Sequence, residues 1–249
     1  MTTATPVTPA TVKVPWKLPG ELQDKQGFNG CFFGYPGAGK TSLIATGPKP
    51  LIIDVDGTAV RSLADRDDVQ IMPIGSWDDI QKISDYLLTR SHPFETIGWD
   101  TLTAMQRFAI KKVVKTPGAQ PSQGEYGAAN ELVLEVVRQW CAAARETGVH
   151  VIFGVHAEEV KDESTGVVLI RMSLTPGTLK GVNQATDTIG YLQVVPGSDT
   201  RKLLLRTTNK IIAKHHQPQS GTKLSHELTN PTMDMFIDQM RSITSERGK

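Results

Sequence analysis

The segment from residue 34 to residue 41 constrains the fold most, because it reads Gly-Tyr-Pro-Gly-Ala-Gly-Lys-Thr and fills the pattern Gly-x-x-x-x-Gly-Lys-[Ser/Thr]. Its glycines allow a tight turn and let the backbone approach a polyphosphate without a Cβ in the way. A β-rich run at residues 28–33 precedes the loop, and residues 42–45 can continue a helix after it. This order of strand, loop and helix predicts a site for a nucleoside triphosphate. The predicted contacts are Gly34, Tyr35, Pro36, Gly37, Ala38, Gly39, Lys40, Thr41 and Ser42.

Two side chains of the loop and one later acid have predicted roles in phosphate and metal chemistry. We expect Lys40 to reach the β- and γ-phosphates and the Thr41 hydroxyl to bind Mg²⁺. Asp100 ends the apolar run at residues 96–99, and ligands of open parallel sheets gather at the carboxyl ends of strands. An Asp after such a run is often only a helix cap. Downstream of a phosphate loop, we interpret Asp100 as the second metal-binding residue.

Hydrolysis also needs a group that orients or deprotonates the attacking water. The run at residues 51–55 contains Asp54 and is followed by Asp56, and strand alternation predicts that the two carboxylates share a face. We predict Asp56 as the base or water-orienting group, with Asp54 in support beside the metal. The alternative is turn chemistry, since Asp-Gly is a common turn dipeptide. His156 follows the run at residues 150–155 and is a candidate sensor of the γ-phosphate, although a lone histidine is more often structural.

Alternating strand and helix signals predict one α/β domain over residues 16–249, after a flexible tail at residues 1–15. We expect a mainly parallel central sheet flanked by helices, with antiparallel β-hairpins in the C-terminal half. The expected strands, buried on both faces, are 28–33, 51–55, 70–74, 96–99 and 150–155. The expected helices are 40–46, 77–89, 103–114 and 128–147, and the expected hairpins pair 158–161 with 167–173 and 190–195 with 203–208.

The distribution of charge along the chain is more informative about a nucleic-acid partner than the net charge. The formal net charge of +1 gives no global sign of a nucleic-acid partner. Residues 201–223 nevertheless contain six Lys or Arg and no Asp or Glu. This basic stretch is either a solvated face or an electrostatic footprint for the phosphates of DNA. Its candidates for DNA contact are Arg201, Lys202, Arg206 and Lys210.

Cysteine usage and hydropathy indicate a compartment. Cys31 and Cys141 lie in apolar segments and are predicted to be buried thiols, which fits a reducing cytoplasm. No apolar run approaches the roughly 18 residues that span a bilayer. We therefore expect a cytoplasmic protein with no membrane partner.

The motifs together resemble a known family. The order of the phosphate loop, the Asp-x-acid strand end, Ile-Gly-Trp-Asp-Thr-Leu-Thr and Val-Ile-Phe-Gly-Val-His is similar to that of the phage-encoded AAA/RecA-type P-loop ATPases. Some of these are recombination or single-strand annealing proteins. The similarity covers about residues 28–214 and implies a RecA-like fold. In the family, the strand resembling residues 50–57 has a Glu that activates water. Here the acid is Asp56, one methylene shorter, so we expect slow turnover.

The resemblance also implies partners. RecA-type ATPases bind nucleotide between subunits, with a Lys or Arg donated by the neighbour. Lys214 is the first candidate for this residue and Lys210 the second. Loops near residues 116–127 and 157–173 correspond to segments that contact single-stranded DNA in such proteins. The second loop contains four acids that would repel phosphate, so its assignment is the weaker one.

The predicted function is therefore an ATPase that uses ATP and Mg²⁺, forms a homo-oligomeric ring or filament, and acts on DNA in phage recombination or replication. A small-molecule or nucleotide kinase is one alternative, but the arginines of this chain form no evident lid. A nucleotide-binding assembly module with little turnover is the other, because Asp56 replaces Glu.

Overall fold

The computed structural model describes residues 26–116, 118–161, 163, 166–215 and 225–245, and the expected tail at residues 1–15 lies outside them. The strands are β1 (Asn29–Gly34), β2 (Pro50–Asp54), β3 (Gln70–Pro73), β4 (Thr96–Asp100), β5 (His150–Lys161), β6 (Val168–Met172), β7 (Thr188–Val194), β8 (Arg201–Leu204) and β9 (Glu227–Thr229). The helices are α2 (Lys40–Ile44), α3 (Ala59–Ser62), α4 (Trp77–Thr89), α5 (Leu102–Val113), α6 (Gln123–Thr147), α7 (Pro176–Ala185) and α8 (Met233–Ser245).

The strands of the described ranges form a single nine-stranded sheet in the order β3-β2-β4-β5-β1-β7-β8-β9, with β6 paired to β5. The first six strands of this order are parallel, whereas β8, β9 and β6 pair in the antiparallel sense. The fold class is therefore confirmed, as are both expected hairpins, although the second strand of the later hairpin spans Arg201–Leu204 and not 203–208. In the register, Gly34 of β1 lies opposite His156 of β5, and Asp54 of β2 lies opposite Asp100 of β4. The pairing thus places functional candidates from four strands at one edge.

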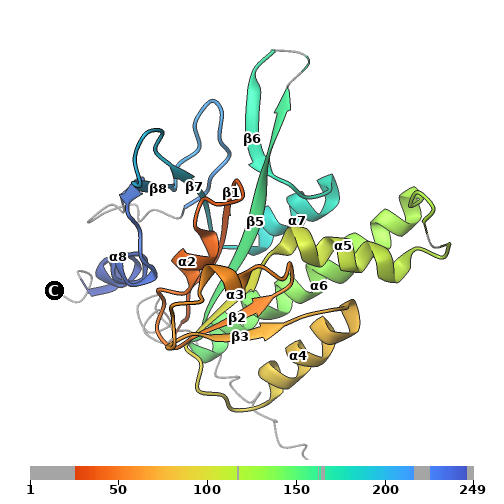
Figure 1. Cartoon of the computed structure of the whole chain (residues 1–249), viewed down its shortest axis with the longest axis horizontal. Helices are drawn as coiled ribbons and strands as arrows, with labels where there is room; N and C mark the ends of the chain where they lie inside the picture. Colours follow the sequence, from red (N-terminus) through yellow and green to blue (C-terminus); the bar gives the residue numbers. More distant parts are fainter. Residues whose placement is uncertain (1–25, 117, 162, 164–165, 216–224, 246–249) are drawn as a thin grey trace, which may run out of the picture.

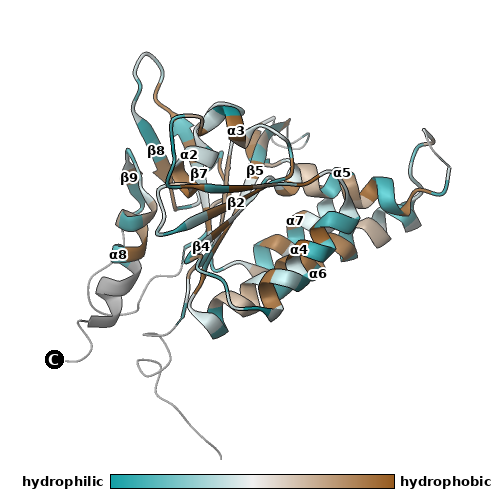
Figure 2. Cartoon of the chain, turned by 60° about the horizontal axis from the view of Figure 1, so that its bottom comes forward, coloured by the Kyte–Doolittle hydropathy of each residue, from teal (hydrophilic) through white to brown (hydrophobic). Residues whose placement is uncertain are grey.

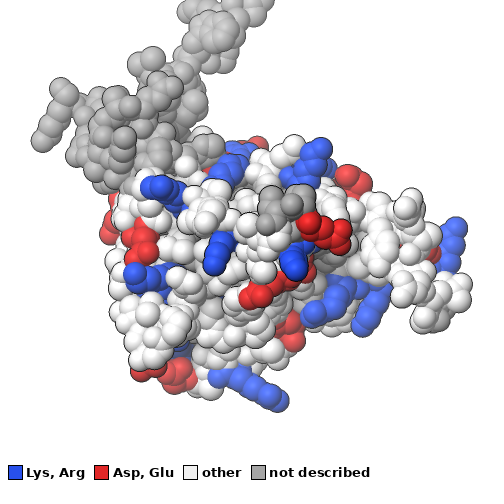
Figure 3. Space-filling model, turned by 90° about the horizontal axis from the view of Figure 1, so that it is seen from above, with Lys and Arg blue, Asp and Glu red and all other residues white. Residues whose placement is uncertain are grey.

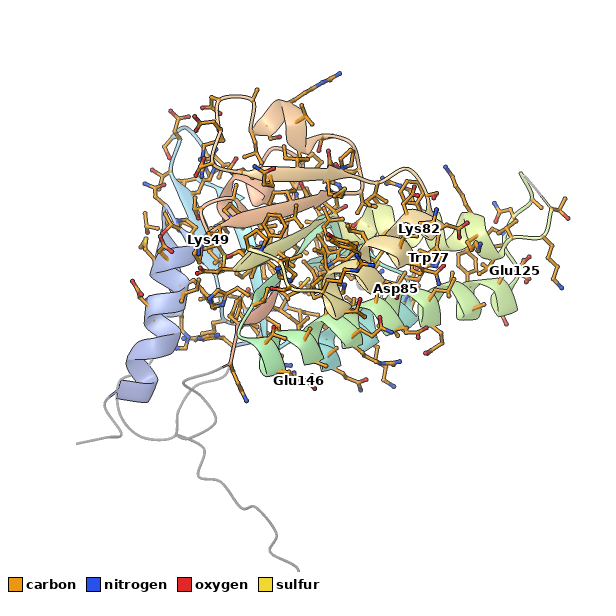
Figure 4. All side chains as sticks on the ribbon, turned by 90° about the horizontal axis from the view of Figure 1, so that it is seen from below. Lys49, Trp77, Lys82, Asp85, Glu125 and Glu146 are labelled. Carbon is orange, nitrogen blue, oxygen red and sulfur yellow. The ribbon has the colours of Figure 1, made fainter. Side chains whose placement is uncertain are left out.

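Helices cover both faces of the sheet (Figures 1 and 2). Helices α4, α5, α6 and α7 pack on one face, and α2, α3 and α8 pack on the other. Alternation along β1 supplies both layers, because Phe33 belongs to the first core and Phe32 to the second. The longest helix, α6, has Glu125 near one end and Glu146 near the other (Figure 4). It buries Trp140 against Trp99 of β4, with ring centroids 5.7 Å apart.

Helix α6 begins earlier than the apolar periodicity indicated. It starts at Gln123, because Ser122 and Glu125 form a capping box: the Ser122 hydroxyl accepts from the Glu125 N–H, and the Glu125 carboxylate accepts from the Ser122 N–H at 2.8 Å. The expected loop at residues 116–127 is therefore wrong in its second half, which is helical. Serine followed three residues later by glutamate was the available signal.

Strand β3 is less buried than expected. It was predicted to be covered on both faces, but it is an edge strand, and Met72 at its centre is 38% exposed. The exposure of β3 could not be predicted from the sequence alone, because edge position depends on strand order and not on local composition.

Four elements had no prediction: α3, α7, α8 and β9. Helix α8 did have a signal, since Met233, Phe236 and Ile237 have helical spacing and are buried in the second core. It packs beside Phe28 and Phe32, with the Phe28 and Phe236 ring centroids 4.4 Å apart.

The cysteine prediction is confirmed, because Cys31 and Cys141 are both free and buried. Burial raises the pKa of Cys141 to about 12, so its thiol stays protonated at neutral pH. Among the helices of the described ranges, none combines the length and the apolar character needed to cross a membrane.

Candidate functional site

The residues predicted for phosphate, metal and water chemistry meet at the carboxyl edge of the parallel strands. This edge faces upward in Figure 1, where β5 rises beyond it into the hairpin with β6. Lys40, Thr41, Asp56, Asp100 and His156 all line one cavity of about 590 Å³. Its position agrees with the rule that open parallel sheets bind ligands beyond their carboxyl ends.

The phosphate loop connects β1 to α2, and two of its glycines are needed for different reasons. Gly39, the N-cap of α2, has a φ of 93°, which favours glycine. A Cβ on Gly34 would instead collide with the carbonyl oxygen of Leu192 on the neighbouring β7. Helix α2 ends at Ile44, earlier than the expected residue 46. Because α2 has only about one turn, the backbone N–H groups of the loop contribute more to binding a phosphate than the helix macrodipole does.

Lys40 lies folded back over its own loop. Its Nζ donates to the carbonyl oxygens of Gly34 at 3.0 Å and Tyr35 at 3.2 Å, and the residue is only 6% exposed. Burial lowers the pKa of Lys40, while Asp100 and Asp56 oppose that shift. A buried ammonium held only by carbonyl dipoles is well placed to exchange them for phosphate oxygens.

Thr41 and Asp100 are joined directly, since the Thr41 hydroxyl donates to the Asp100 carboxylate at 2.6 Å. Burial raises the pKa of Asp100 to about 6, the Thr41 hydrogen bond opposes the rise, and the charge of Asp56 adds to it. A hydroxyl and a carboxylate fit Mg²⁺, which takes few protein ligands beside phosphate and water oxygens. In the described part of the chain, no group of three or more His, Cys, Asp or Glu could hold a metal without such help.

Asp56 and His156 form a pair in the same cavity, with 3.5 Å between the Asp56 Oδ2 and the His156 Nε2. The other Asp56 oxygen accepts from the Thr58 hydroxyl at 2.6 Å and from the Thr58 N–H at 3.2 Å. Burial alone would raise the pKa of Asp56, but the hydrogen bonds from His156 and Thr58 outweigh it and lower the pKa. The histidine predicted to sense phosphate therefore contacts the predicted base.

Asp54 does not line this cavity, and its supporting role behind the metal stays a prediction. Its carboxylate accepts three backbone N–H groups, those of Gly57 at 2.9 Å and of Thr58 and Ala59 at 3.2 Å. These bonds organise the turn before α3. The predicted shared face fails, because β2 ends at Asp54 and the chain bends before Asp56.

The described residues of the basic stretch do not form one patch, Lys223 lies outside them, and DNA contact stays a prediction. Arg201 lines the phosphate cavity, and Lys202 pairs with Glu227 at 2.7 Å. Arg206 and Lys210 are exposed. On the face seen in Figure 3, basic and acidic side chains are interspersed. Residues near in sequence have different neighbours in space: Arg201 lies at the phosphate loop, Lys210 lies beside Ile170 of β6, and Lys214 pairs with Ile189 of β7.

Lys214 is held by its own chain. Its Nζ donates to the carbonyl oxygens of Asn183 at 3.0 Å and Thr186 at 2.7 Å, at the C-terminal end of α7. Its backbone pairs with Ile189 of β7. Within its own chain Lys214 thus satisfies the end of α7, and its contact with a neighbour's nucleotide stays a prediction.

The second predicted DNA loop, at residues 157–173, is mostly the hairpin of β5 and β6. Glu158 pairs with Arg171 at 2.8 Å across the hairpin. The next residue, Glu159, accepts from the phenol of Tyr35 at 2.7 Å. The hairpin thus contacts the phosphate loop itself, which no pattern in the sequence indicated.

Sequence reasoning assigned no part in this cavity to five of the residues that line it: Thr58, Ser62, Thr101, Arg107 and Arg201. Arg107 comes from α5, the helix that follows Asp100, whereas Arg201 comes from β8 and is far along the chain from any motif. Thr58 could have been found, since it closes the Asp-Gly-Thr turn directly after β2.

Comparison with known proteins gives one family. A family model described as an AAA domain matches residues 27–216, which is well over half of the chain. No curated protein matches the chain. Among solved structures, the crystal structure of the RadB recombinase is similar, with 14% sequence identity and a TM-score of 0.49. That alignment covers 82% of this chain and 87% of the other. At this identity and score, the likeness does not assign a function.

Proposed function

The chain belongs to the AAA-domain family, and from this premise we propose that it binds ATP with Mg²⁺ at the carboxyl edge of its sheet and hydrolyses it. The observation that supports this most is the 2.6 Å hydrogen bond between Thr41 and Asp100 beside the buried Lys40. These three groups supply the charge and oxygen ligands that a bound triphosphate needs. Asp56 and His156 in the same cavity add a group for activating water.

Each side chain has a defined part in this proposal. Lys40 exchanges the carbonyls of its loop for the β- and γ-phosphates. Thr41 and Asp100 would hold Mg²⁺, which neutralises developing charge on the phosphate oxygens when bound. Asp56 accepts a proton from water as the water oxygen attacks the γ-phosphorus and the bond to the bridging oxygen of ADP breaks. His156 orients Asp56 by the contact at 3.5 Å.

Slow turnover is part of the proposal. The lowered pKa of Asp56 makes it a weak base, and Thr58 already donates two hydrogen bonds to one of its oxygens. The same observation favours the second candidate function, a nucleotide-binding assembly module with little hydrolysis. The two differ in whether Asp56 reaches the water or only stabilises the turn.

The proposals of DNA binding and self-association come from the resemblance to recombination ATPases. We place the DNA partner near the β5–β6 hairpin, because the contact between Tyr35 and Glu159 joins that hairpin to the phosphate loop and Arg171 neutralises Glu158 on it. Nucleotide between subunits is also proposed, with the exposed Lys210 in place of Lys214 as the donated residue. A particle-size measurement with and without ATP tests assembly directly.

The test of the whole proposal is ATP affinity and phosphate release, with and without single-stranded DNA, for the wild type and for Lys40→Ala. We expect the variant to lose ATP binding or at least about a hundredfold in turnover. The control is Lys49→Ala, whose exposed side chain pairs with Glu95 at the opposite edge (Figure 4). Binding without release would select the assembly module. Phosphate transfer to a nucleoside monophosphate would select a kinase.

A further inference from the structure

Arg201 lies over the phosphate loop of its own chain. An atom built as a Cβ on Gly39 would be 2.6 Å from the Arg201 Nε and 3.2 Å from its Cζ, so the guanidinium covers the glycine directly. Arg201 begins β8, more than 150 residues after the loop, and reaches it because β8 is paired to β7, the neighbour of β1.

The backbone of Arg201 is fixed from both sides by one residue. The Arg201 N–H donates to the Asn230 side-chain oxygen at 2.9 Å, and the Asn230 N–H donates to the Arg201 carbonyl at 2.7 Å. The side chain, in contrast, has no ion pair with any described residue. Its neighbour Lys202 does have one, with Glu227. A positioned arginine without an acidic partner, lining a cavity, is suited to an anion that is brought by a ligand.

The position of Arg201 indicates which part of the ligand it meets. Asp56, Asp100 and His156 come from β2, β4 and β5, on one side of β1 in the sheet. Arg201 comes from β8, on the other side of β1. The groups suited to water and metal chemistry define the γ-phosphate end of the cavity, so the rest of the nucleotide extends toward Arg201.

We propose that Arg201 binds the α- and β-phosphates of the nucleotide in cis, across Gly39, and is a nucleotide-affinity residue and not a DNA contact. This inference rests on the proposed nucleotide site. It differs from the assignment of the basic stretch to DNA, and it assigns a role in the same subunit, not in a neighbour's site. A guanidinium can form two parallel hydrogen bonds to phosphate oxygens, which an ammonium cannot.

The test compares the dissociation constants of ATP, ADP and GDP for the wild type, Arg201→Ala and Arg201→Lys. We expect Arg201→Ala to weaken ATP and ADP equally, by about tenfold or more, because charged hydrogen bonds are lost. Arg201→Lys should restore part of the loss, and GDP should be weakened as much as ADP. Arg61→Ala is the matched control, since Arg61 is an exposed arginine of α3 that does not line the cavity.

Three outcomes would overturn the inference. The first is an unchanged affinity of Arg201→Ala for ADP. The second is a loss of affinity confined to ATP, which would place Arg201 at the γ-phosphate. The third is a loss confined to the adenine nucleotides, which would place Arg201 at the base. A normal affinity of Arg201→Ala together with lost binding in Lys40→Ala leaves the proposed function intact and rejects this role alone. Failure of the wild type to bind any nucleotide rejects both.

Discussion

At the scale of single residues, Asp100 is a carboxylate whose position suits metal binding at the expense of stability. Burial raises its pKa from 3.8 to about 6. Below pH 3.8 the group is protonated in both the folded and the unfolded chain, so its burial does not lower the free energy of unfolding through ionisation there. Between pH 3.8 and about 6 the carboxyl ionises in the unfolded chain but not in the folded one, so the free energy of unfolding falls as the pH rises and levels off above about 6. Bound Mg²⁺ would offset that loss.

We therefore expect Asp100→Asn to stabilise the ligand-free protein while abolishing metal-dependent turnover. At about pH 7.5 the free energy of unfolding, measured with denaturant, should rise by about 2 kcal/mol. The gain should shrink toward zero near about pH 4, where the wild-type carboxyl is protonated as well. A variant less stable than the wild type at about pH 7.5 would show that the carboxylate is not destabilising.

Asp56 is predicted to act on water and not on nucleotide affinity. Asp56→Asn should lower ATP turnover by about a hundredfold or more, because the amide cannot accept the proton. The dissociation constant of ADP should stay within about twofold, because Asp56 faces the γ end of the cavity. Asp65→Asn removes an exposed carboxylate beyond α3 and is the control. Undiminished turnover in Asp56→Asn would assign the base to another residue.

At the scale of elements, the end of α7 depends on a lysine from a distant segment. The Lys214 ammonium satisfies the carbonyl oxygens of Asn183 and Thr186, a favourable place for a cation at a helix C-terminus. The helix has no basic residue in its own last turn. Lys214 provides the cation instead, and its backbone pairing with Ile189 on β7 holds it at the end of α7.

Lys214→Ala should therefore affect stability more than chemistry. We expect the free energy of unfolding to fall by about 1–2 kcal/mol, because two carbonyls lose a charged donor. Turnover well below the unfolding temperature should stay within about twofold of the wild type. Lys210→Ala, at an exposed position, should leave stability unchanged. If Lys214→Ala instead lost turnover at full stability, the lysine would act on nucleotide after all.

At the scale of the whole molecule, the sheet order decides which residues meet. Strands β2, β4 and β5 stand in a row beside β1, so acids and a histidine separated by up to about a hundred residues line one cavity with the phosphate loop. The hairpin of β5 and β6 extends past the same edge (Figure 1) and touches the loop through Tyr35 and Glu159. One edge of the sheet thus connects the nucleotide to the surface proposed for DNA.

Much of this could be predicted, and the failures share a cause. The buried strands, the position of Asp100 at the end of β4 and that of Asp56 just past β2 follow from short apolar runs that end in polar residues. His156 follows such a run but lies inside β5, which continues to Lys161 beyond the expected residue 155. The edge exposure of β3, the use of Asp54 by a turn and the binding of Lys214 to the end of α7 could not be predicted. Each depends on which segments become neighbours, and one-dimensional patterns do not contain that information.

The phosphate loop and the α/β class were determined by the sequence alone, because backbone freedom at glycine and hydrophobic periodicity are local properties. Tertiary structure alone decided which partners the charged side chains of the basic stretch contact. It placed Arg201 against Gly39, Lys202 against Glu227 and Lys214 beneath α7. The physical reason is that a charge takes its role from the partner that desolvates or pairs with it, and that partner is chosen by the pairing of strands.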